Sequence, residues 1–164
     1  MEHCLGFWNL VAANQADADI SIVDAQTAKE VARVPEGAIT GHEVATALDG
    51  ITGYVTIYGD SSVGDAGTDG RELLAIDLAS RKIVGRLDFG QGVRPHGIAM
   101  NSQDGLLYVA TELDRTVTIV DPKTFKIVGS ISTGQVNLIC LRSLTMVALA
   151  APQMWDRAVS RSWT

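Results

Sequence analysis

Two of the three histidines, His42 and His96, open stretches that match each other, HEVATALDG at 42–50 and HGIAMNSQDG at 96–105. A neutral imidazole ring is a common ligand of Zn²⁺ and Cu²⁺ near pH 7. If the fold brings the two rings to one place, His42 and His96 are therefore candidate ligands of a divalent metal ion. The alternative is that each ring satisfies backbone groups where two structural elements meet. No other cofactor is predicted.

A second candidate for metal chemistry is the acidic stretch YGDSSVGDAGTDGRE at 58–72, which contains Asp60, Asp65, Asp69 and Glu72 among glycines. Carboxylate oxygens on a flexible loop are the ligands that Ca²⁺ prefers. Their spacing does not match the Asp-x-Asp-x-Asp-Gly pattern of a calcium-binding loop. The sequence therefore favours a solvated loop that contacts a partner over a calcium site.

No pattern of nucleophilic catalysis is present. The histidines are not accompanied by a G-x-S-x-G motif, and the chain has neither a P-loop nor a G-x-G-x-x-G that follows a strand. The two cysteines, Cys4 and Cys140, form no metal-binding motif or disulfide framework. We therefore predict no catalytic residues.

The charge of the chain is acidic, with a formal net charge of −6. This argues against nucleic acid as a partner, because phosphates require clustered Lys and Arg. No stretch approaches the roughly 20 apolar residues of a membrane span. The first residues, Met-Glu-His-Cys, lack the basic region and apolar run of a signal peptide. As written, the chain is expected in the cytoplasm.

The elements that would position these residues are repeated along the chain. Asp24, Asp77 and Asp121 each precede a glycine by 13 residues. The segments around them align without gaps: ISIVDAQTAKEVARVPEG at 20–37, LLAIDLASRKIVGRLDFG at 73–90 and VTIVDPKTFKIVGSISTG at 117–134. Each predicts a β-hairpin, since two apolar runs rich in Val and Ile flank a polar turn. The three aspartates are predicted to accept hydrogen bonds from backbone N–H groups of these turns.

The complete repeat contains four short strands. Upstream of each hairpin lies a YVAT-like strand, and further upstream lies the strand that begins at His42 or His96. Asp77 and Asp121 are 44 residues apart, while Asp24 and Asp77 are 53 apart because of the acidic loop. Four strands in about 40–45 residues is the period of a β-propeller blade. The blades are predicted at 8–37, 42–90 and 96–134, after an N-terminal remnant at 1–7.

The third unit, PHGIAMNSQDGLLYVATELDRTVTIVDPKTFKIVGSISTG, resembles the YVTN-repeat β-propellers. The motif that gives this family its name corresponds to Tyr108-Val109-Ala110-Thr111 and, more loosely, to Tyr54-Val55-Thr56. The resemblance covers about residues 8–134 and implies an all-β partial propeller of about two and a half four-stranded antiparallel blades. It also implies a longer parent protein, periplasmic or secreted. Copper-binding propeller enzymes are similar in placing histidines near the axis.

After Gly134 the repeat stops, and residues 135–164 are an atypical tail, irregular or helical. We interpret this tail as frameshifted. Reading each codon's third base with the next two bases forces Gly from Met146-Val147 and Asp from Trp163-Thr164, where a further blade would need them. The chain is thus expected to be a truncated fragment. Its terminal blades should expose Val and Ile on open faces, through which the chain would self-associate.

Three functional hypotheses follow, in decreasing order of preference. The first is a non-catalytic repeat module that binds a small-molecule or protein ligand, since a propeller is a rigid scaffold for loops. The second is a fragment without independent activity. The third is a fragment of a propeller enzyme, lactonase-like or a metal-dependent oxidoreductase, which would need ligands from at least three blades.

Overall fold

The computed structural model describes residues 9–37, 39–61 and 65–135 of the 164-residue chain. These residues form eleven strands in three antiparallel sheets and contain no helix. The described part accordingly has no helix long and apolar enough to cross a membrane. The prediction of an all-β fold is confirmed, while the predicted tail lies outside the described residues, except for Gln135.

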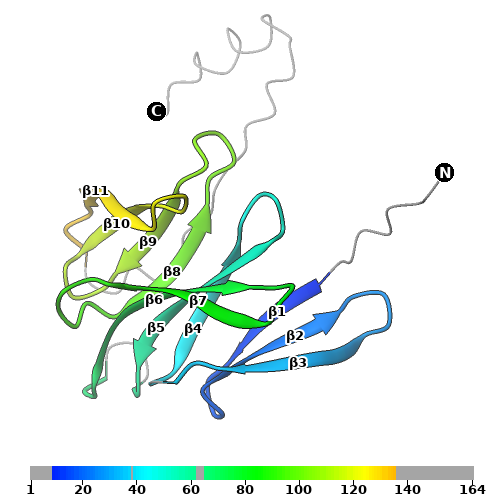
Figure 1. Ribbon diagram of the computed structural model, residues 1–164. Helices are drawn as coiled ribbons and strands as arrows, with labels where there is room; N and C mark the ends of the chain where they lie inside the picture. Colours follow the sequence, from blue (N-terminus) through cyan, green and yellow to red (C-terminus); the bar gives the residue numbers. More distant parts are fainter. Residues whose placement is uncertain (1–8, 38, 62–64, 136–164) are drawn as a thin grey trace, which may run out of the picture.

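The sheets follow one another along the chain and stand side by side (Figure 1). The first sheet has three strands in the order β1-β2-β3: Asn9–Asn14, Asp19–Asp24 and Lys29–Pro35. The second has the order β4-β5-β6-β7: Gly41–Thr46, Thr52–Gly59, Asp69–Asp77 and Lys82–Asp88. The third has the order β8-β9-β10-β11: Pro95–Met100, Leu107–Thr111, Thr116–Asp121 and Lys126–Ser132. In each sheet the sequence neighbours pair, as in the predicted four-stranded repeat.

The outer hairpins of the three sheets have the same turn. The carboxylates of Asp24, Asp77 and Asp121 accept backbone N–H groups from Gln26, Ser80 and Lys123 at 2.6–2.9 Å. Hydrogen bonds within each turn favour the charged form and lower the pKa of all three carboxyl groups, mainly those from Thr27 N–H to Asp24, from the Ser80 side chain to Asp77 and from Lys123 N–H to Asp121. The fourth residue after each aspartate adopts a left-handed conformation, with φ of 52° at Ala28, 60° at Arg81 and 51° at Phe125.

Apolar side chains join neighbouring sheets through two clusters. One lies between the first and second sheets and contains Ile20 and Ile22 on one side and Leu74 and Ile76 on the other. The other lies between the second and third sheets, with Leu73 opposite Val120. Successive residues of β6 thus pack against different sheets, because side chains alternate across a strand. β4 and β8, the first strands of these two sheets, also lie beside each other.

The outward face of the first sheet differs from the prediction that terminal faces expose Val and Ile. Positions equivalent to Ile57, Leu74 and Ile83 hold Asn14, Ser21 and Glu30, which are linked by hydrogen bonds. The Asn14 amide donates to Ser21 Oγ at 2.7 Å, and Ser21 Oγ donates to Glu30 Oε2 at 2.7 Å. Arg33 extends the network to Glu30, Asp17 and Asp19. A satisfied polar network makes this face compatible with water. On the opposite terminal face, Ile131 is half exposed as predicted.

Candidate functional site

The starts of β4 and β8 bring the two predicted histidines together. His42 and His96 are the second residues of these strands, and their ring centroids lie 5.9 Å apart. Tyr58, the seventh residue of β5, completes a triangle of rings, at 5.2 Å from His42 and 5.8 Å from His96. His96 and Tyr58 are fully buried, while His42 remains partly exposed. The site is therefore a polar cluster that reaches solvent beside His42.

A second group of buried polar residues lies behind the rings. The Tyr58 hydroxyl donates to Glu112 Oε2 at 2.6 Å, and both residues are buried. The Arg94 guanidinium lies over the Tyr58 ring, with 5.5 Å from Cζ to the centroid, and forms an ion pair with Asp69. Arg94 is buried as well. Its charge is thus compensated by a carboxylate and by the electron-rich face of an aromatic ring.

The sequence repeat explains why these residues meet. GYVTIYGD at 53–60 aligns with LYVATELD at 107–114, which places Tyr58 opposite Glu112. Their backbones are held in the same way: Tyr58 N–H donates to Thr40 O at 3.1 Å, and Glu112 N–H donates to Arg94 O at 3.4 Å. Equivalent positions of adjacent repeats therefore contact each other directly. This alignment is the sequence signal that points to Tyr58, Glu112 and Arg94, which belong to no recognisable motif and were not predicted as site residues.

Protonation in the cluster is controlled mainly by burial. Desolvation lowers the pKa of His42, so its ring is neutral at pH 7. Desolvation and the bond to Glu112 raise the pKa of Tyr58, so the phenol keeps its proton and acts as a donor to that carboxylate. His42 Nδ1 is buried without a hydrogen-bond partner and lies 3.9 Å from Glu43 Oε1. This nitrogen is the unsatisfied polar atom of the cluster.

The ring nitrogens differ in their availability to a metal ion. His96 Nδ1 lies 3.1 Å from Arg94 O, a distance suited to a hydrogen bond. Within the described residues, no group of three or more His, Cys, Asp or Glu side chains is arranged to hold a metal ion. For the metal site predicted at His42 and His96, the described residues therefore supply two adjacent imidazole rings and no third ligand beside them.

The acidic loop uses several of its carboxylates within the fold. Asp60 Oδ1 accepts the Thr68 N–H at 2.5 Å, Asp69 pairs with Arg94, and Glu72 pairs with Arg86 at 2.8 Å. Residues 62–64 of this loop lie outside the described residues. In the described part, Asp60, Asp69 and Glu72 are thus engaged by partners within the fold.

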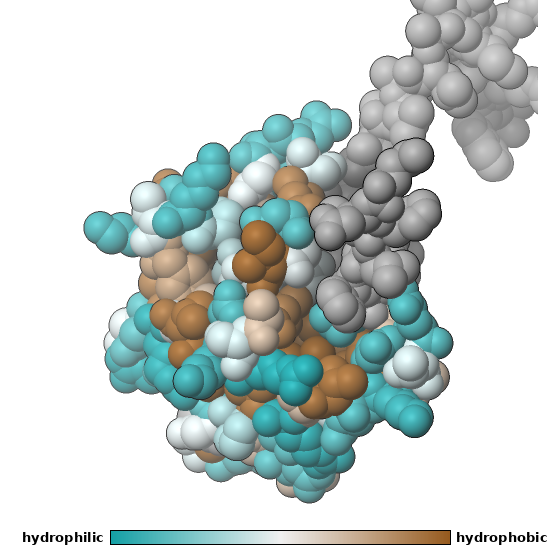
Figure 2. Space-filling model, turned by 45° about the vertical axis from the view of Figure 1, so that its right-hand side comes forward, coloured by the Kyte–Doolittle hydropathy of each residue, from teal (hydrophilic) through white to brown (hydrophobic). Residues whose placement is uncertain are grey.

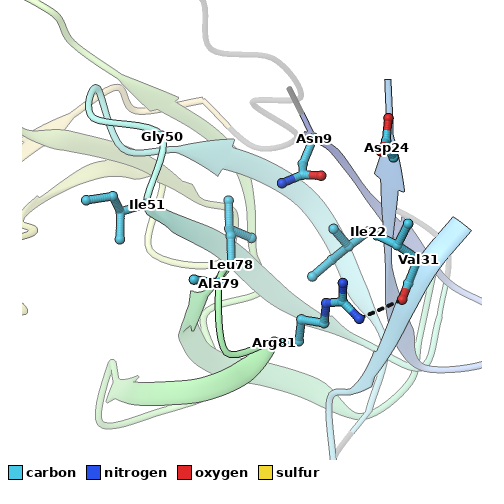
Figure 3. Close-up of a pocket in the computed structure, with 9 residues that line it drawn as sticks. All are labelled: Asn9, Ile22, Asp24, Val31, Gly50, Ile51, Leu78, Ala79 and Arg81. Atoms are coloured by element: carbon cyan, nitrogen blue, oxygen red, sulfur yellow. Dashed lines mark hydrogen bonds between the residues drawn. The ribbon is translucent and has the colours of Figure 1, made fainter. Parts of the chain in front are cut away.

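A pocket of about 450 Å³ lies at the opposite end of the strands, between the first and second sheets. Its apolar wall includes Ile22 and Leu78, and the Arg81 guanidinium crosses it to donate to Val31 O at 2.9 Å (Figure 3). At the next junction the equivalent residue, Phe125, places its ring against Tyr54 and Gly85. Arg81 and Phe125 thus occupy equivalent places at the two sheet junctions and make different contacts there.

Comparisons with known proteins place this geometry in a fold class. No protein-family model matches the chain, and no curated protein matches it either. Among solved structures, 444 chains match, so the likeness identifies a widespread fold rather than one activity.

Two of these structures illustrate the likeness. Hydrazine synthase of Kuenenia stuttgartiensis is 22% identical with a TM-score of 0.65, and the match covers 78% of this chain and 33% of that one. Dihydro-heme d1 dehydrogenase NirN, in complex with DHE, is 19% identical with a TM-score of 0.62, and the match covers 77% and 26%. Both are β-propeller proteins.

The chain is thus an all-β partial propeller, whose three sheets correspond to successive blades. It spans about a third or less of the length of the two structures named here.

Proposed function

We propose that this chain is a non-catalytic binding module, part of a longer propeller, and that its ligand contacts the polar cluster at His42. The observation that carries the proposal is the buried His42 Nδ1, which has no hydrogen-bond partner. A buried polar atom without a partner costs about 1–3 kcal/mol. The His42 side chain is partly exposed, so a ligand can contact its ring, and a ligand that supplies the missing hydrogen bond as the ring turns toward it recovers this free energy.

Binding is favoured over catalysis because the neighbouring groups are already engaged. Tyr58 is bonded to Glu112, and Arg94 is paired with Asp69. These bonds hold the rings in fixed positions, which favours recognition of a small polar ligand.

A fragment screen with ¹H–¹³C NMR of the histidine ring resonances tests the proposal. We expect small polar heterocycles to shift the His42 Cε1–H resonance, and His42→Phe to abolish this binding while the fold is retained. His3→Ala is the matched control and should leave the binding unchanged. Fragments that bind equally well to the His42→Phe variant would show that the ligand site lies elsewhere.

A second candidate is a metal-dependent enzyme fragment, favoured by the 5.9 Å separation of the two histidine rings. Hydrazine synthase and the dihydro-heme d1 dehydrogenase are named as enzymes. At 22% and 19% identity their likeness supports the fold. The activity of this chain therefore depends on whether its own histidines bind a metal ion.

Isothermal titration calorimetry with Zn²⁺ and Cu²⁺ tests this candidate. Because each imidazole would supply one of the ligands, His42→Ala and His96→Ala should each weaken binding by about tenfold or more. His3→Ala should bind as the unchanged chain does. If all three variants bind equally, the metal ion is not held at His42 and His96 and the enzyme hypothesis loses its basis.

A further inference from the structure

The outer edge of β1 differs from the edges of its equivalents. In the second sheet, β5 pairs with β4 on one side and with β6 on the other, and in the third sheet β9 pairs with β8 and β10. β1 occupies the same place in the first sheet, yet β2 is its one partner among the described strands. The far edge of β1 thus presents a row of backbone donors and acceptors, which is a template for strand addition.

This edge is accessible to solvent. Asn9, Leu10 and Ala12 are exposed, and Leu10 leaves 61% of its surface in contact with water. Figure 2, which turns the β1–β3 side of the molecule forward, shows apolar side chains gathered in a band bounded by hydrophilic residues. An added strand would cover Leu10 and complete the backbone hydrogen bonds of β1.

The pockets at the two sheet junctions show where a strand beside β1 would end. Between the second and third sheets, the end of β4 and its turn supply Ala47, Leu48 and Asp49 as one wall of a pocket of about 420 Å³. The pocket between the first and second sheets has no equivalent wall among its lining residues, and Asn9 of β1 stands at its border (Figure 3). A strand beside β1 would end where this wall is lacking.

We propose that the outer edge of β1 binds an extended peptide with the sequence pattern of the inner strands β4 and β8. The occupant is defined by the repeat, because both described inner strands pair antiparallel to the strand equivalent to β1. In the register of β8 on β9, Ile98 lies opposite Val109 and Met100 opposite Leu107. The same residues of a β8 peptide would therefore lie opposite Ala12 and Leu10. The proposal does not rest on the proposed ligand at His42.

A synthetic peptide of residues 93–101, VRPHGIAMN, tests the proposal on the full chain. Its matched control carries Ala99→Pro. In the chain, Asn101 N–H donates to Leu106 O, directly before β9. Since successive N–H groups of a strand point to opposite sides, the Ala99 N–H also points toward β9. Proline removes that donor. Fluorescence anisotropy measures affinity, and hydrogen exchange with mass spectrometry shows where the peptide binds.

The expected result is saturable binding that slows amide exchange in β1, with at least tenfold weaker binding of the Ala99→Pro peptide. Equal binding of both peptides, protection confined to other strands, or the absence of binding would overturn the proposal. Protection of β1 that grows with protein concentration and coincides with dimer formation would also overturn it, since a second copy would then be the occupant.

Discussion

Gly70→Ala should produce a large loss of stability in the second sheet. A Cβ at this second residue of β6 would overlap the carbonyl oxygen of Ile57 and the backbone of Tyr58. These are backbone atoms of the adjacent strand, so β5 and β6 would have to separate. Overpacking of this kind costs about 3 kcal/mol. We expect the melting temperature to fall by about 10 °C in a thermal scan followed by circular dichroism.

The effect should extend to the polar cluster. The Gly70 carbonyl accepts the N–H groups of Val93 and Arg94, which lead into β8, and Tyr58 lies on the strand that must move. Gly129→Ala is the control, because a Cβ at that strand glycine would meet a single side-chain atom, of Ile119, at an ordinary distance of 3.6 Å. This control should melt within about 2 °C of the unchanged chain. If the Gly70→Ala variant melts at the same temperature as the unchanged chain, β5 and β6 are not as close as the structure shows.

Glu36→Gln should remove a pH dependence of stability near neutrality. Glu36 is fully buried after β3; Oε2 accepts the Gly41 N–H at 2.6 Å, and Oε1 has no partner. Burial, opposed by the bond from Gly41 and aided by the charge of Asp19, raises the pKa of this carboxyl to about 7. Since the unfolded pKa is about 4.5, the folded state binds the proton more tightly.

The sign of the effect follows from this difference. The stability contributed by the proton is present below pH 4.5 and is lost as the pH rises through about 7. Glutamine imitates the protonated acid and keeps an acceptor for Gly41, so the variant should lose the decline in stability that Glu36 causes across this window. At pH 8 it should melt about 5 °C above the unchanged chain.

Glu30→Gln is the matched control for this experiment. Hydrogen bonds from Ser21 and Arg33 lower the pKa of Glu30, so its titration affects stability at acidic pH. The variant should therefore keep the decline between pH 5 and 7. If Glu36→Gln also keeps that decline, another group is responsible for it.

The sequence by itself determined the strands and their turns. Alternating apolar residues before and after Asp24, Asp77 and Asp121 identify hairpins because a strand has a period of two and an aspartate satisfies a turn locally. These interactions join residues a few positions apart. The repeat of the pattern was therefore sufficient to predict an all-β fold with sheets in the order of the chain, and the structure confirms it.

The tertiary structure decided what lies between the sheets. Tyr58 and Glu112 are 54 residues apart, and their hydrogen bond exists because neighbouring sheets pack with equivalent strands side by side. The local pattern around Glu36 gives no sign of a buried carboxyl, since its burial accompanies the close approach of Gly41, whose N–H donates to Glu36 Oε2. The polar outward face of the first sheet likewise depends on strand register. Contacts of this kind follow from packing, which no periodicity within a single strand encodes.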